Sequence, residues 1–173
     1  MPDATGLELI AQEVRERVGA DAVVDTGFAR GEATLRVAPG AVHDVLRHLK
    51  EAAEEPFDFL ASLHGLDYFP DEPRLAVHYQ LLSRQRAERI KVATRLSVDE
   101  AELPTVTDLY EGANFQEREV FDFFGIVFAG HPDLRRTHMP EDYEGHPQRR
   151  DYPIGGEPVK FTFNQDQGPR WYD

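Results

Sequence analysis

Apolar side chains recur every three or four positions in two parts of the N-terminal half. This spacing predicts a helix over residues 7–18, which Gly19 can end. A second helix is predicted after Pro39, because proline suits the first turn of a helix. The apolar face of this second helix consists of Val42, Val45, Leu46 and Leu49.

Alternation of apolar and polar residues predicts strands between and after these helices. Two short strands are expected over residues 22–28 and 33–37, with a turn between them at residues 29–31. Three longer strands follow, and the last of them alternates apolar positions with basic ones. The apolar positions of the three strands are Phe57, Phe59, Ala61 and Leu63, then Leu75, Val77, Tyr79 and Leu81, then Ile90, Val92, Thr94 and Leu96.

A third helix is predicted to begin at Asn114, because Asn is a good N-cap and Glu117 completes a capping box three residues later. Gly125 can end this helix. An Arg118–Asp122 pair, four residues apart, then belongs to its solvated face. The order α-β-β-α-β-β-β-α indicates an α+β fold: a two-layer α/β sandwich with a mixed, largely antiparallel sheet and an extended C-terminal arm.

The composition narrows the classes of function. The 173 residues include no cysteine, which excludes disulfides, thiolate zinc sites, cysteine-held iron–sulfur clusters and a thiol nucleophile. The formal net charge of −13 disfavours nucleic acid as a partner. No apolar run reaches the ~18 residues that a membrane span needs, so we expect no direct insertion into a membrane.

Half of the 12 prolines lie in the last quarter of the chain. Because proline interrupts helices and central strands, we expect a body over residues 1–126 and an extended arm over residues 127–173. An arm with little hydrophobic periodicity is either disordered or lies against another surface. Double arginines that follow two Gly-His-Pro turns, and Trp171 near the end of the chain, favour contact with a partner.

The arm also contains three histidines with carboxylates nearby. An alternative function is therefore that of a stand-alone metal-dependent enzyme that uses these histidines. His131, His138 and His146 are the candidate ligands. None of them has the spacing of three or four residues that places two ligands on one helix face. The simpler interpretation is that these imidazoles form hydrogen bonds within an ordered arm.

Two stretches of the sequence resemble one protein family. The first runs from Asn114 to Ile126 and reads NFQEREVFDFFGI. The second reads GHPDLRR over residues 130–136 and continues as PEDYEGHPQRRDYP over residues 140–153. Together they resemble the subunit known as C of the proton-pumping NADH:quinone oxidoreductase, the bacterial respiratory complex I. Phe115 and Tyr143 stand where this family usually has Trp.

The resemblance implies a cofactor-free structural and assembly subunit of the peripheral arm of that complex, held by the complex on the cytoplasmic side of the bacterial cell membrane. It implies docking against the quinone-binding subunit, known as D, and against neighbouring hydrophilic-arm subunits. NADH dehydrogenase (quinone) activity, electron transport and proton translocation would belong to the complex, with flavin, iron–sulfur clusters, NADH and quinone held by other subunits. An equivalent subunit of a membrane-bound hydrogenase, or of another quinone- or coenzyme-reducing dehydrogenase, is the alternative.

No catalytic residue is expected in this chain, and its functional residues would be those that contact the partner. They are Glu117, Arg118, Glu119, Asp122, His131, Arg135, Arg136, His146, Arg149 and Arg150. Their role would be recognition through charge-assisted hydrogen bonds. We also expect the arm to be unordered before assembly, so that a protease cuts the isolated chain beyond about residue 130.

Overall fold

The computed structural model describes residues 3–53 and 56–153, so Trp171, which is expected to contact a partner, lies outside the described residues. The predicted helices and long strands occur in the predicted order, with a 3-10 turn before α2, a π-helical turn after it and two further short strands, β6 and β7. In chain order they are α1 (Ala4–Arg17), β1 (Val23–Ala29), β2 (Glu32–Val37), η1 (Pro39–Ala41), α2 (Val42–Arg47), η2 (His48–Ala52), β3 (Phe59–Asp67), β4 (Leu75–Ser83), β5 (Glu88–Leu96), β6 (Glu102–Pro104), α3 (Ala113–Phe124) and β7 (Val127–Ala129).

Five strands form one mixed sheet in the order β1-β2-β5-β4-β3. Strands β2 and β5 run parallel, whereas the β1–β2, β4–β5 and β3–β4 pairs are antiparallel. Strand β5 follows β2 only after α2, β3 and β4. This long connection lets β5 run beside β2 in the same direction. This arrangement confirms the predicted α+β fold with a mixed, largely antiparallel sheet.

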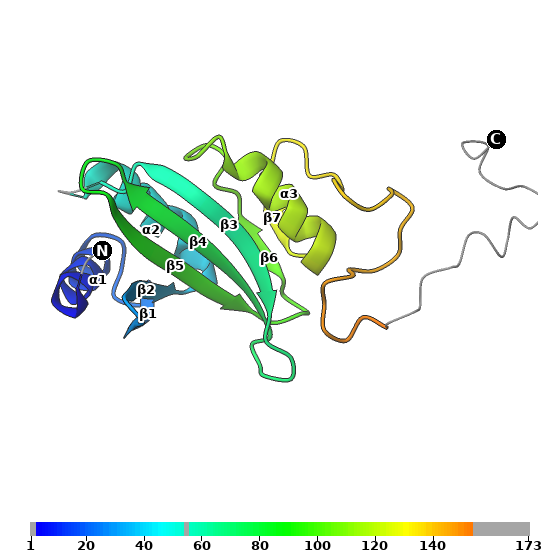
Figure 1. Cartoon of the computed structure of the whole chain (residues 1–173), viewed down its shortest axis with the longest axis horizontal. Coiled ribbons are helices and arrows are strands. Elements are labelled where there is room, and N and C mark those ends of the chain that lie inside the picture. Colours follow the sequence, from blue (N-terminus) through cyan, green and yellow to red (C-terminus); the bar gives the residue numbers. More distant parts are fainter. Residues whose placement is uncertain (1–2, 54–55, 154–173) are drawn as a thin grey trace, which may run out of the picture.

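One face of the sheet carries the hydrophobic core. The register aligns Leu63, Tyr79, Val92 and Leu35 across four strands, and all four are buried. In Figure 1, α2 lies behind the sheet and α3 lies beside β3. Gly65 on β3 allows this last approach, because a Cβ there would collide with the ring of Phe124. The predicted alternation over β5 is confirmed: Ile90, Val92, Thr94 and Leu96 are all buried.

The predicted phase of β3 is wrong at its start. A bulge between Leu60 and Ser62 shifts the register by one residue, and such a shift exchanges the two faces of a strand. Leu60 therefore points into the core, whereas Phe59 is 47% exposed and Ala61 is exposed. Nothing in the alternation of the sequence marks the bulge.

Strands β6 and β7 form a separate parallel pair that the sequence does not predict, because three-residue segments carry too little alternation. This pairing attaches the first residues of the expected arm to the segment that precedes α3. From Gly130 to Pro153 the chain has no helix or strand, as expected for this proline-rich part. Within the described ranges, no helix has the length and apolar character of a membrane span.

The start of α3 differs from the predicted capping box. Gly112 is the N-cap and forms no side-chain capping bond, whereas Asn114 lies inside the helix. Glu117 cannot cap the helix because its carboxylate is turned into the protein. The predicted end of the helix is confirmed: Gly125 adopts the left-handed conformation, with φ of 71°.

Candidate functional site: the end of α3 and the arm that covers it

The arm, here its described residues 130–153, closes the C-terminal end of α3. The last carbonyl groups of a helix have no partner within the helix. Three of them accept hydrogen bonds from the arm, which also brings positive charge to the negative end of the helix dipole. The bonds run from His146 Nδ1 to Asp122 O (3.0 Å), from Gln148 N to Phe123 O (3.2 Å) and from Arg149 Nε to Phe124 O (2.7 Å).

Gly125 makes this closure possible. A Cβ at this position would collide with the imidazole of His146 and with the guanidinium of Arg149. Its left-handed backbone conformation also suits glycine better than any other residue. The glycine therefore both ends the helix and leaves room for the arm.

Asp122 is the centre of the first anchor of the arm. Its side chain is fully buried and accepts a bond of 2.8 Å from Arg136 Nη1. Its other oxygen accepts bonds of 2.7–3.0 Å from three successive backbone N–H groups of the arm, at residues 137–139. Burial alone would raise the pKa of Asp122, but these four donors hold it below its usual range. The predicted solvated Arg118–Asp122 pair is therefore wrong, and Arg118 donates instead to the carbonyl of Arg135.

A second anchor joins the arm to the end of β3. Arg74 is 6% exposed and lies between two carboxylates, donating to Asp67 at 2.6 Å and to Asp151 at 2.7 Å. Asp67 also accepts a bond of 2.7 Å from the backbone N–H of Arg150. Hydrogen bonds from Arg74 hold the pKa of Asp67 far below its ordinary value, although burial opposes this. Sequence reasoning did not find this cluster, because Arg74 and Asp151 lie 77 positions apart and match no motif.

Glu117 occupies a closed polar site on the inner face of α3. Its side chain has no exposed surface and accepts bonds from Thr105 Oγ1 (2.6 Å) and from the backbone N–H of Val106 (2.8 Å). Burial raises the pKa of Glu117 to about 7, and these two bonds only partly offset the burial. His131 Nε2 lies 3.9 Å from the carboxylate and is within bonding distance (3.1 Å) of the carbonyl of Asn114. Glu117 thus fixes the segment after β6 rather than facing a partner.

Most of the ten predicted contact residues bind parts of their own chain. Six of them hold α3, the arm or the segment after β6: Glu117, Asp122, His131, Arg136, His146 and Arg149. Arg118 and Arg150 also donate to carbonyl groups of the chain, at Arg135 and Phe69. Glu119, Arg135 and Arg150 are exposed. Phe115, which the prediction left out, is 69% exposed on the same side of α3, with Arg118 against its ring at 5.6 Å. This exposure depends on the fold, so the sequence alone carries no signal for it.

The three arm histidines bind different groups rather than a common centre. His131 and His146 lie next to separate backbone carbonyls, and His138 stacks on the ring of Phe123 with 4.9 Å between ring centres. Among residues 3–53 and 56–153, no group of three metal-binding side chains comes together. The described arm therefore offers hydrogen-bonding and packing groups, and these can recognise and hold a surface.

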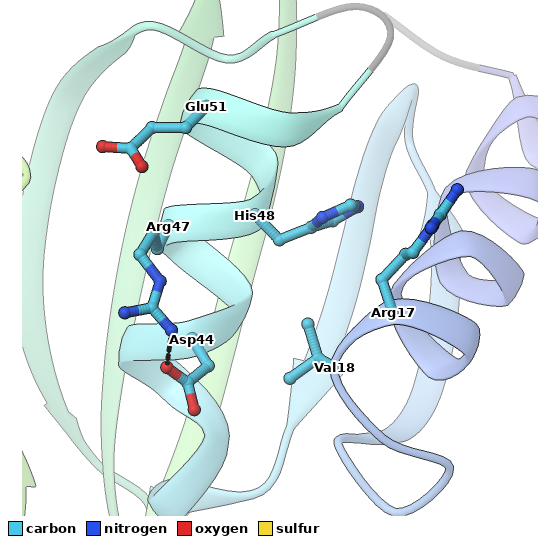
Figure 2. A pocket seen from close by; sticks show the side chains of 6 residues that line it. All are labelled: Arg17, Val18, Asp44, Arg47, His48 and Glu51. Carbon is cyan, nitrogen blue, oxygen red and sulfur yellow. Dashed lines mark hydrogen bonds and ion pairs between the residues drawn. The ribbon is translucent and has the colours of Figure 1, made fainter.

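A hollow of about 290 Å³ lies between the end of α1 and α2, remote from the arm. Figure 2 shows that its polar side chains do not converge: Arg47 turns to Asp44, and Glu51 points away from Arg17. His48 lies 3.0 Å from Glu13. This hollow lacks the convergent polar groups of a ligand site.

Comparison with known proteins assigns the family. Residues 35–158 match the family model described as the 30 kDa subunit of the respiratory-chain NADH dehydrogenase. The chain is 47% identical over 147 residues to the NADH-quinone oxidoreductase subunit known as C of Roseiflexus castenholzii, covering 85% of this chain and 84% of that protein. It is 41% identical over 156 residues to the subunit of the same name from Herpetosiphon aurantiacus, covering 88% and 90%.

Two solved structures resemble the fold. One is titled as the trypsin-resistant fragment 1–134 of Nqo5, with a TM-score of 0.58, 35% identity and coverage of 74% of this chain and 98% of that chain. The other belongs to an archaeal membrane-bound sulfane sulfur reductase, described as a respiratory membrane complex. Its TM-score is 0.68 with 26% identity, and the match covers 96% of this chain and 94% of that chain.

The fold thus places the chain in a class of small α+β proteins that includes a chain of an archaeal respiratory membrane complex. Within this class, the chain belongs to the family of the 30 kDa subunit of the respiratory-chain NADH dehydrogenase, as the resemblance of residues 114–153 predicts.

Proposed function

We propose that this chain is a structural 30 kDa-type subunit of a proton-pumping NADH:quinone oxidoreductase and docks against the quinone-binding subunit of that complex. The observation that carries the proposal is the way in which the arm binds the C-terminal end of α3. The arm uses two partly buried arginines, Arg136 and Arg149, together with His146 to hold the end of the helix, and a strip of aromatic and charged side chains beside them stays exposed. We call this strip the α3 face; it consists of Phe115, Arg118, Glu119, Arg135 and His138.

The α3 face has the composition of a protein-binding site. Phe115 is 69% exposed and Arg118 lies against it, and aromatic residues and arginine are enriched among the residues that dominate binding energy. Arg135 has 64% of its side chain exposed and is held by both carboxylate oxygens of Asp133. A guanidinium fixed in this way loses little further entropy when a partner binds.

The chemistry of the chain supports a role without a redox centre. The sequence has no cysteine to hold an iron–sulfur cluster, so we propose that electrons pass through other subunits. We also propose a peripheral position on the cytoplasmic side of the membrane, maintained through the partner. Metal analysis and electron paramagnetic resonance of the isolated chain test this: stoichiometric iron would contradict the cofactor-free role, and stoichiometric zinc would favour the metal-enzyme alternative.

Variants of exposed side chains test the docking. Phe115→Ala combined with Arg135→Ala removes two groups of the α3 face, whereas Leu9→Ala removes an apolar side chain on α1 that is 64% exposed. After purification of the complex in mild detergent, the double variant should lower the amount of this chain bound to the quinone-binding subunit about tenfold. Leu9→Ala should leave that amount unchanged. A normal yield with normal quinone reductase activity in the double variant would contradict the proposal.

A related complex with a different electron donor is the second candidate. The likeness to a chain of an archaeal sulfane sulfur reductase complex supports it, although at 26% identity against 47% for the relative from Roseiflexus castenholzii. The purified complex distinguishes the two: NADH-dependent quinone reduction supports the first, and activity with hydrogen or a sulfur substrate but not with NADH supports the second.

A further inference from the structure

The sheet has a second face, opposite the core, on which no described helix lies (Figure 1). We call it the open face. The strand register arranges its side chains in rows that cross the sheet. Gln80 and Lys91 lie side by side in one central row, and the next row contains His64, His78, Ala93 and Arg36.

The charge of the open face is opposite to that of the chain. Its rows carry four cationic side chains, Arg36, Arg89, Lys91 and Arg95, in a chain with a net charge of −13. Two of them have acidic partners, since Arg36 pairs with Asp25 and Lys91 lies 3.0 Å from Glu32. Arg89 is exposed and has no acidic partner among the described residues. Arg95 stacks on the ring of Tyr68 at 4.4 Å, and its Nε and Nη2 atoms are buried and have no acceptor in the described part of the chain.

The pKa values of two histidines at the centre of the face are lowered, in part by this positive charge. His64 and His78 are cross-strand neighbours with ring centres 5.5 Å apart. Burial, together with the charge of His64, Lys91 and Arg36, lowers the pKa of His78 to about 4, although Glu32 opposes this. Burial and Lys91 lower the pKa of His64 as well. Both imidazoles are therefore neutral at pH 7, so the positive potential of the face comes from the arginines and the lysine.

The open face also carries an exposed apolar side chain. Ala76 and Ala93, near its centre, are buried. At one end of the face, Phe59 is 47% exposed directly across from Leu82. An aromatic side chain beside a row of cations fits a polypeptide that carries both acidic and apolar groups.

We propose that the open face binds an acidic segment of a second neighbouring subunit of the complex, distinct from the one that contacts the α3 face. The inference rests on membership of a multisubunit complex but not on which subunit occupies the α3 face. Charge complementarity selects an acidic occupant, and the exposed Phe59 selects a protein over a free anion. The chain would then join two subunits, one on each side of its fold.

Photo-crosslinking in the purified, intact complex tests the proposal. A photoreactive amino acid replaces Gln80, which lies in the middle of the face beside Lys91, and a second preparation carries it at Phe115. The expected product at position 80 joins an acidic segment of a subunit that the probe at position 115 does not reach. A cross-link to residues 154–173 of the same chain, to a second copy of the chain, or to no protein would overturn the proposal.

Charge variants show whether electrostatics hold the contact. Arg89→Glu, at an exposed position without an acidic partner among the described residues, should lower the cross-link yield from position 80 about tenfold at physiological salt. Glu32→Gln is the matched control, because it removes an acidic group from the same side of the sheet and should maintain or raise the yield. Cross-linking from position 115 should not change in either variant, which separates this proposal from docking at the α3 face. An unchanged yield with Arg89→Glu would refute the charge argument.

Discussion

The buried carboxyl of Glu117 makes the stability of this chain depend on pH near neutrality. Burial raises its pKa from the ordinary 4.5 to about 7. The folded chain therefore binds the proton of Glu117 more tightly than the unfolded chain does. Stability from this group is fully present below pH 4.5 and is lost as the pH rises through 7. Because one pKa unit corresponds to about 1.4 kcal/mol, the ionised form costs the folded chain about 3 kcal/mol at pH 8.

Glu117→Gln removes this cost while keeping an oxygen that can accept the N–H of Val106. The amide must then face Thr105 Oγ1, which can accept as well as donate a hydrogen bond. We therefore expect the variant to be more stable than the wild type by about 2 to 3 kcal/mol at pH 8 and to lose this advantage at pH 5. The free energy of unfolding, measured in urea at both pH values, gives the difference directly.

Glu119→Gln is the control, because it lies on the same helix with 56% of its side chain exposed. Its difference from the wild type should stay within about 0.5 kcal/mol and should not depend on pH. Other titrating groups are common to all three proteins and cancel in the comparison. If Glu117→Gln and the wild type show the same dependence on pH between 5 and 8, the burial argument fails.

Three further predictions concern the arm. Arg136→Ala should destabilise the chain by about 3 kcal/mol in urea, since it leaves a buried carboxylate without its cation, whereas Arg135→Ala, at an exposed position, should leave the stability nearly unchanged. Gly125→Ala should cost at least about 1 kcal/mol and expose the arm to trypsin, because a Cβ cannot fit beneath the arm; wild-type cleavage rates would contradict this. Asp67→Asn should weaken the loss of stability on acidification. The low pKa of Asp67 next to Arg74 contributes stability above pH 3.8 that disappears as the carboxylate is protonated, and an unchanged acid transition would refute this.

The body could be predicted from the sequence because its signals are local. Apolar spacing located α1, α2 and the three long strands, and the sequence placed the end of α3 at Gly125. The bulge after Leu60 could not be predicted, since one added residue is decided by packing across the sheet. Strands β6 and β7 are too short to show a period, and their pairing depends on contacts between distant parts of the chain.

The candidate site was predicted by residue type more than by role. The motif names the charged residues around α3, but the role expected for them, binding a partner, stays a prediction. Spacing alone could not show that Glu117 and Asp122 point inward, because their environment is made by a segment beyond the helix. Arg136 and Arg149 were expected to bind a partner, yet in the structure they bind α3 of the same chain. These internal hydrogen bonds offer a second way to order the arm, one that does not need a partner.

The closure of α3 by residues 146–149 has a consequence for how the chain is made. The helix is synthesised well before the residues that cap it, so its last turn stays incomplete until the C-terminal part has left the ribosome. A chain that stops short of His146 would present free carbonyls where the finished protein presents an ordered arm. Only a chain translated through Arg149 can therefore form the capped end of α3 that the structure shows.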